Sequence, residues 1–186
     1  MTEFRAAPPP ISAPSAPPVI RTARLTLRPA TMEDLEPLHA VLSDARAMRY
    51  WATLPHRALD ETRDWLQAMI DAPAGEGEDW IITHRGTAIG KAGLWRFPEI
   101  GFILHPDRWG QGLAGEAVAA VIDRAFAVHR LPRITADVDP RNTASLRLLA
   151  RLGFVETGRA SRTLRLGDEW CDSVYLELAA PGPDAG

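Results

Sequence analysis

A strand that leads through a short loop into a glycine-crowded helix start constrains this chain more than any other feature. The segment reads Glu99-Ile-Gly-Phe-Ile-Leu-His-Pro-Asp-Arg-Trp-Gly-Gln-Gly-Leu-Ala-Gly115. Missing side chains let a ligand approach the backbone, and the first N–H groups of a helix have no partner within it. Because these donors lie at the positive end of the helix dipole, the segment predicts an anion site suited to a diphosphate.

Two other interpretations of the same glycines stay open. Gly110, Gly112 and Gly115, with Asp137 downstream, also fit the fingerprint of a dinucleotide-binding fold. Five residues (105–109) separate the strand from the first glycine, however, and too little chain follows Asp137 for the further β-α-β units that such a fold needs. The glycines could also serve only as small packing residues at a helix start.

The remaining pattern predicts a mixed α/β domain. Alternating or continuous apolar runs bounded by turn residues predict strands, and apolar positions three and four apart predict helices. The strands are expected at 24–28, 79–83, 87–94, 99–104, 133–138, 154–157 and 174–178, and the helices at 35–42, 60–70, 112–129 and 142–152. This order predicts a largely antiparallel sheet of about seven strands, flanked by about four helices, with one β-α-β crossover.

Composition divides the chain into three parts. Residues 1–18 are rich in Ala, Pro and Ser and are expected to be a disordered arm, residues 19–180 the folded domain, and residues 181–186 a flexible tail. The net charge of −3 gives no positive field for nucleic acid or an anionic membrane, and no apolar run approaches a membrane span. One cysteine, Cys171, and no apolar leader segment fit a cytoplasmic protein.

Four segments in order resemble the GNAT acetyltransferases, and within them the RimJ/RimL-like branch that acetylates N-terminal amines. The resemblance covers about residues 20–178. It rests on Thr22-Ala-Arg-Leu-Thr-Leu-Arg-Pro29 with Asp34, on the glycine segment, on Asp139-Pro-Arg-Asn-Thr-Ala-Ser145 with Leu152-Gly-Phe154, and on Gly167-Asp-Glu-Trp-Cys-Asp-Ser-Val-Tyr175. Trp109 stands where the family usually has Gln or Arg, although the branch often carries this Trp.

The resemblance implies how acetyl-CoA would be held. Phe102, Ile103 and Leu104 would present a strand edge to the pantetheine amides and the thioester. Asn142 would reach the pantetheine arm or its neighbourhood, with Ser145 nearby on the same helix. The diphosphate would lie on the backbone amides of Gly110, Gln111, Gly112, Leu113, Ala114 and Gly115.

Acetyl transfer to an amine needs a neutral nucleophile, stabilisation of an oxyanion and a proton for the departing thiolate. A strand N–H near Leu104 is the expected oxyanion donor, and Glu99 is the candidate base, acting directly or through water. The tyrosine that many relatives use as the acid is replaced by Leu149, so Ser145 is the candidate for this role. Simple structural roles for Glu99 and Ser145 remain equally open. Cys171 is expected to pack rather than to react.

The acceptor amine is not specified by the sequence. A peptide N-terminus and a small-molecule amine both fit, no metal site is expected because the five histidines are scattered, and the chain could be a monomer or a homodimer. A non-catalytic acyl-CoA-binding module and, more distantly, a nicotinamide-dependent oxidoreductase are the alternative functions. Residues expected to line the acceptor groove, from their loop and strand-end positions, are Trp51, Trp95, Arg96, Trp170 and Asp172.

Overall fold

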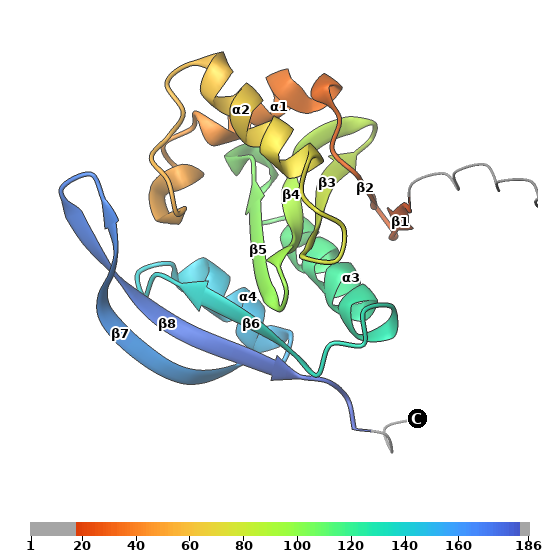
Figure 1. Ribbon diagram of the computed structural model, residues 1–186, viewed down its shortest axis with the longest axis vertical. Helices are drawn as coiled ribbons and strands as arrows, with labels where there is room; N and C mark the ends of the chain where they lie inside the picture. Colours follow the sequence, from red (N-terminus) through yellow and green to blue (C-terminus); the bar gives the residue numbers. More distant parts are fainter. Residues whose placement is uncertain (1–17, 183–186) are drawn as a thin grey trace, which may run out of the picture.

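One eight-stranded sheet runs through the part of the chain that the computed structural model describes, residues 18–182 (Figure 1). The strands lie side by side in the order β1-β2-β3-β4-β5-β6-β8-β7. Most of the predicted arm and the last four residues of the predicted tail lie outside the described residues. The strands are β1 (Ile20–Arg21), β2 (Leu25–Arg28), β3 (Glu78–His84), β4 (Thr87–Arg96), β5 (Glu99–Leu104), β6 (Arg133–Val138), β7 (Val155–Leu166) and β8 (Glu169–Ala179).

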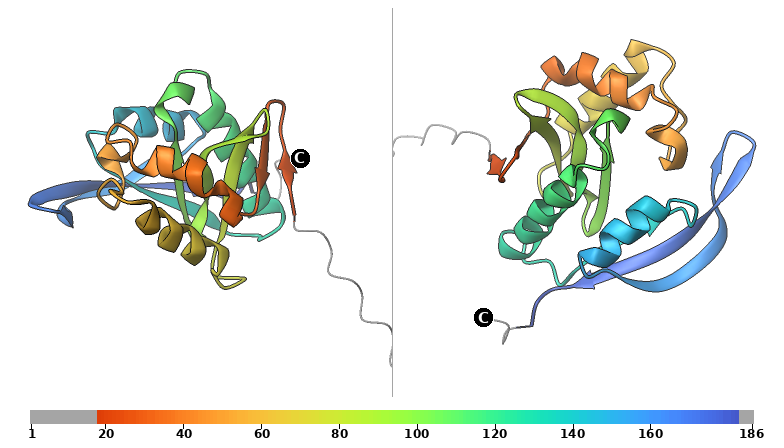
Figure 2. Two further views of the ribbon diagram at one scale, coloured as in Figure 1. Left: turned by 90° about the horizontal axis from the view of Figure 1, so that it is seen from above. Right: turned by 180° about the vertical axis from the view of Figure 1, so that it is seen from behind.

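Helices cover both faces of this sheet. Figure 2 shows α1 and α2 on one face and α3 and α4 on the other. None of the helices in residues 18–182 is both long and apolar enough to cross a membrane. The α-helices are α1 (Leu35–Leu42), α2 (Leu59–Ile70), α3 (Leu113–Ala127) and α4 (Thr143–Arg151), and the 3-10 helices are η1 (Met32–Asp34), η2 (Met48–Tyr50) and η3 (Pro106–Arg108).

The predicted fold class is confirmed, with one strand more than expected. The additional strand, β1, has two residues and pairs with β2 through Ile20–Leu27 and Arg21–Thr26. Two residues are too short to show an apolar alternation, so the sequence pattern could not reveal it. The antiparallel pairing of the described strands is interrupted once, where β5 pairs with β6 in parallel after the crossover through α3.

The main core lies between the sheet and the pair α3 and α4. It buries Trp80 of β3 and Ile134 of β6 against Val118 and Val121 of α3 and Leu149 of α4. Two smaller clusters on the opposite face pack α1 and α2 against β3, β4 and β5. Because helices cover both faces of the sheet at β4, seven consecutive residues of this strand are buried. The well-packed centre of the sheet therefore holds the neighbouring strand ends in place.

The hairpin of β7 and β8 is much longer than the sequence predicted. The predicted strand at 154–157 extends to Leu166, and that at 174–178 begins at Glu169. Two register shifts interrupt their pairing, and most side chains of β7 are exposed. A strand with polar residues on both sides gives little alternation to detect, so long-range pairing rather than local pattern determines its length.

Candidate active site

A cleft opens where β5 and β6 part. The two strands share one register pair, Glu99 with Thr135, and diverge beyond it (Figure 1). A cavity of about 550 Å³ lies at this opening, and its lining comes from α2, α4, the loop after η2 and strands β3 to β8. A cavity of this size is typical of sites for small molecules.

The cavity brings together seven of the predicted site residues. Its lining includes Trp51, Trp95, Glu99, Phe102, Asn142, Ser145 and Asp172. The lining does not include Arg96 and Trp170, which were expected at the acceptor groove. Arg96 lies over the indole of Trp95, with its guanidinium carbon 4.8 Å from the ring centroid, and Trp170 is 44% exposed beside Arg162.

The strand edge of β5 presents its backbone to the cleft. The His105 N–H donates to the Ile89 carbonyl of β4 at 2.8 Å. Because amides alternate in direction along a strand, the Phe102 and Leu104 N–H groups point away from β4, towards the gap. The side chains of Ile103 and Leu104 are buried, so these two residues offer a ligand only their backbone. The Leu104 carbonyl already accepts a 3.0 Å hydrogen bond from the Trp109 indole, which fixes the following loop to the strand.

The glycine segment forms a backbone cradle at the start of α3. Gly110 and Gly112 have φ angles of 71° and 75°, in the left-handed region that favours glycine. A Cβ added at Gly110 or Gly115 would meet no atom within 4 Å, so the backbone there is open to a ligand. The amides of the first turn, Leu113 to Gly115, precede the first α-helical hydrogen bond, donated by the Glu116 N–H to the Gly112 carbonyl at 3.1 Å. Open backbone and unpaired amides suit the diphosphate of a coenzyme A molecule.

Arg24 supports this cradle from the N-terminal hairpin. Its guanidinium donates to the Gln111 carbonyl at 2.8 Å and to the Glu116 carboxylate at 2.7 Å. Thr22 also donates to Glu116. Burial raises the pKa of Glu116, but the hydrogen bonds from Thr22 and Arg24 outweigh it and hold the pKa below its usual value. The chain segment that opens the domain thus fixes the loop at the start of α3.

On the other side of the cleft, Asn142 begins α4. Its side-chain oxygen accepts a 3.2 Å hydrogen bond from the Ser145 N–H and so caps the helix. The amide nitrogen of Asn142 remains available for a ligand in the cavity. Leu149, at the position where many relatives have a tyrosine, is fully buried and lines the cavity with its side chain.

Arg141 braces the loop before this helix. Its backbone N–H and its guanidinium donate to the Asp139 carboxylate, and the guanidinium also contacts Glu169 of the β7–β8 hairpin and lies 3.5 Å from the Cys171 sulfur. The hydrogen bonds from Arg141 lower the pKa of Asp139 below its usual range. Cys171 is buried at this contact, as expected for a packing residue.

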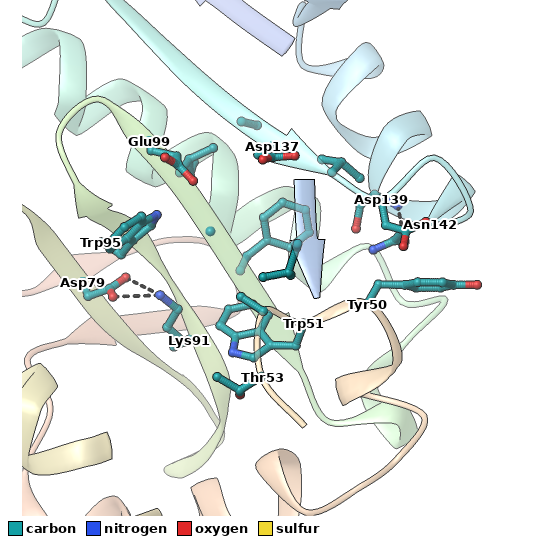
Figure 3. A pocket seen from close by; sticks show the side chains of 18 of the residues that line it. Tyr50, Trp51, Thr53, Asp79, Lys91, Trp95, Glu99, Asp137, Asp139 and Asn142 are labelled. Carbon is teal, nitrogen blue, oxygen red and sulfur yellow. Dashed lines mark hydrogen bonds and ion pairs between the residues drawn. The ribbon is translucent and has the colours of Figure 1, made fainter. Parts of the chain in front are cut away.

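Sequence reasoning missed a buried ion pair in the cavity wall. Lys91 of β4 is 2% exposed, and its ammonium lies 2.7 and 2.8 Å from the two carboxylate oxygens of Asp79 (Figure 3). Lys91 is the single lysine of the chain, beside twenty arginines, which was an available signal. Tyr50 and Asp137 also line the cavity and were not predicted.

An open strand edge, a helix start with unpaired amides, and a cavity beside that strand edge are features of an acyl-CoA-dependent transferase. Comparison with known proteins gives the family. Residues 24–155 match the acetyltransferase (GNAT) domain. The chain is 35% identical over 147 residues to the uncharacterized N-acetyltransferase p20 of Bacillus licheniformis, covering 74% of this chain and 82% of that protein. It is 27% identical to the spermidine N(1)-acetyltransferase of Escherichia coli, covering 81% and 83%.

Solved structures share the fold. RimL, a ribosomal L7/L12 α-N-protein acetyltransferase, superposes with a TM-score of 0.79 at 18% identity, covering 91% of this chain and 98% of RimL. Spermidine N-acetyltransferase from Vibrio cholerae, solved with CoA and spermine, has a TM-score of 0.74 at 22% identity, covering 85% and 96%. The chain belongs to the GNAT acetyltransferase family. The prediction of an acetyl-CoA-dependent N-acetyltransferase is confirmed, and neither alternative function gains support.

Proposed function

We propose that this enzyme acetylates a primary amine that enters the cavity from the α1 and α2 side, with Glu99 as general base. The donor, acetyl-CoA, supplies the activated acetyl group. Its diphosphate would be held by the amides of residues 110–115 and its pantetheine arm by the β5 edge and Asn142. The cavity would then place the acceptor amine where β5 and β6 part, next to Glu99.

The proposal rests on the position of the Glu99 carboxylate and on its lack of a bonding partner. Glu99 is half-buried at the point where β5 and β6 part, and it lines the cavity (Figure 3). Within residues 18–182 its side chain has no ion-pair or hydrogen-bond partner, which among the acidic residues of the lining is also true of Asp137, whereas Glu78, Asp79 and Asp139 are each held by a basic residue. A carboxylate without a structural partner is free to accept a proton from an amine.

The other groups then have defined tasks. The Leu104 N–H faces the gap and can polarise the thioester carbonyl, since its strand neighbour does not use it. The amine nitrogen bonds to the acetyl carbon as the carbon–sulfur bond breaks, and the amine proton passes to Glu99. The departing thiolate takes a proton, for which Ser145, on the opposite wall of the cavity, is the candidate donor or water-binding group.

Glu99→Gln tests the central assignment. We expect kcat to fall about 100-fold near neutral pH, the range typical for loss of a general base, with acetyl-CoA affinity unchanged by isothermal titration. The loss should narrow at high pH, where more of the amine is already neutral. Glu36→Gln is the matched control, because it removes the same charge from an exposed position on α1. Equal kcat for the Glu99→Gln variant and the wild-type enzyme across the pH range would remove Glu99 from the reaction.

A further inference from the structure

Two glycines lie side by side where β4 and β5 pair, and one of them, Gly101, lines the cavity. Gly93 of β4 is the register partner of Gly101 of β5, and Asp79 of β3 is the partner of Gly93 on the other side. A Cβ on Gly93 would meet the Asp79 backbone at 2.5 Å, and it would also collide with the Asp79 carboxylate. The Asp79 side chain therefore fills the space above Gly93, while the space above Gly101 stays open.

The open space above Gly101 has three walls. A Cβ built on Gly101 would lie 3.8 Å from the Trp95 ring, 3.9 Å from the Trp51 ring and 3.9 Å from the Lys91 ammonium. All three residues line the cavity, together with Glu99, which lies two positions before Gly101 on the same face of β5. We call this space, bounded by Trp51, Trp95, Lys91 and Gly101, the glycine subsite.

Charge in the glycine subsite comes from Lys91. Its ammonium has three N–H donors, and the Asp79 carboxylate holds it from the side of Gly93. It also lies 5.5 Å from the centroid of the Trp51 ring. Because Asp79 is positioned over Gly93, the pair presents its positive end to the open space above Gly101. An ammonium at this place can donate its remaining N–H to an oxygen lone pair of a ligand.

We infer that the glycine subsite selects acceptors that carry a carbonyl or carboxylate oxygen beside the amine, with Lys91 as the specificity-determining residue. Glu99 takes the amine and Lys91 donates to the oxygen, so the preferred acceptor is an α-aminoacyl group. The inference rests on the proposed function, because it places the amine at Glu99. The shared chemistry occurs in free amino acids, their amides and peptide N-termini.

Three acceptors of similar size separate the possibilities. Alaninamide carries the oxygen, isopropylamine lacks it, and 1,2-diaminopropane has a second amine in its place. We expect wild-type kcat/KM to favour alaninamide, and Lys91→Met with Asp79→Asn to lower that preference about tenfold or more, as for loss of a hydrogen bond to a charged group. Turnover of isopropylamine should change little. Alanine and the dipeptide Ala-Ala then distinguish a carboxylate from a peptide carbonyl.

A second measurement needs no substitution at the ion pair. Because Lys91 is the single lysine, lysine labelled with 13C at Cε gives one side-chain resonance, which should shift with alaninamide and not with isopropylamine. Gly101→Ala, whose methyl would make ordinary contacts, should abolish this shift and the preference. Turnover of amines with no preference and no shift would overturn the subsite while leaving the proposed function intact. Absence of turnover with every amine would overturn both.

Discussion

At the scale of single residues, backbone conformation at two glycines determines whether the diphosphate cradle exists. Gly110 and Gly112 both adopt φ near 70°, which costs other residues about 1–2 kcal/mol. Between them, the Gln111 carbonyl turns towards Arg24. A substitution at Gly110 therefore changes the direction of several amides at once, although its Cβ would meet no atom within 4 Å.

Gly110→Ala is expected to weaken acetyl-CoA binding about tenfold or more and to lower stability by about 1 kcal/mol, because a residue with a Cβ disfavours φ near 70°. Gly86→Ala in the β3–β4 turn is the matched control. Gly86 has φ 82°, and a Cβ there also meets nothing within 4 Å. Isothermal titration and thermal unfolding of both variants check the prediction. Equal affinity in the two variants would show that the Gly110 conformation does not serve the ligand.

Candidate site residues could be predicted from the sequence where a motif carries them, and the buried position of Lys91 beside the cavity could not. The glycine segment, Asn142 and Glu99 were found because their order along the chain has a known meaning. Lys91 becomes significant only through the strand register that brings Asp79 of β3 beside it. No local pattern encodes this pairing, and a lysine in a strand is ordinarily expected to face solvent.

At the scale of elements, the turn from β2 into α1 depends on one buried carboxylate. Asp34 is 2% exposed, and both its oxygens accept hydrogen bonds from Arg28, at 2.6 and 2.8 Å. It also accepts a 2.9 Å hydrogen bond from the Thr31 N–H at the start of η1. Burial raises the pKa of Asp34, but these hydrogen bonds outweigh it and lower the pKa below its usual value.

Asp34→Asn should therefore destabilise the fold by about 2 kcal/mol at neutral pH, because Arg28 loses its charged partner. A depressed folded pKa stabilises the protein above the unfolded pKa of about 4, and this stability is lost as pH falls through the folded value. The difference between variant and wild type should accordingly shrink below about pH 4. Urea unfolding between pH 3 and 7 measures it, with Glu33→Gln, an exposed neighbour, as control. A pH-independent difference would contradict the argument.

Elements with strong local signals were predicted almost to the residue. Strands β5 and β6 have the predicted bounds, because their apolar runs end at a proline or a turn. Helix α3 is shorter than the predicted 112–129 by one residue at its start and two at its end. The β7–β8 hairpin was underestimated, since its outer part is stabilised by pairing and by contacts such as Thr163 with Ser173 rather than by an apolar face.

At the scale of the whole molecule, the sheet consists of two halves that meet at one register pair. The first half holds β1 to β5 with α1, α2 and α3, and the second holds β6, β8 and β7 with α4 (Figure 1). The diphosphate cradle and Glu99 belong to the first half, whereas Asn142 and Ser145 belong to the second. On the proposed assignment acetyl-CoA contacts both halves, and binding should strengthen a junction with few backbone bonds of its own.

CoA is thus expected to stabilise the native state as a whole. At a CoA concentration of 100 times Kd the gain is about 2.7 kcal/mol, which corresponds to a rise in Tm of about 5–10 °C for a chain of this size. Hydrogen exchange should slow at the β5 edge and at the start of α4 together, because the ligand bridges them. NADH and the Gly110→Ala variant serve as controls and should give a smaller shift. Protection confined to the first half would show that the coenzyme does not reach Asn142.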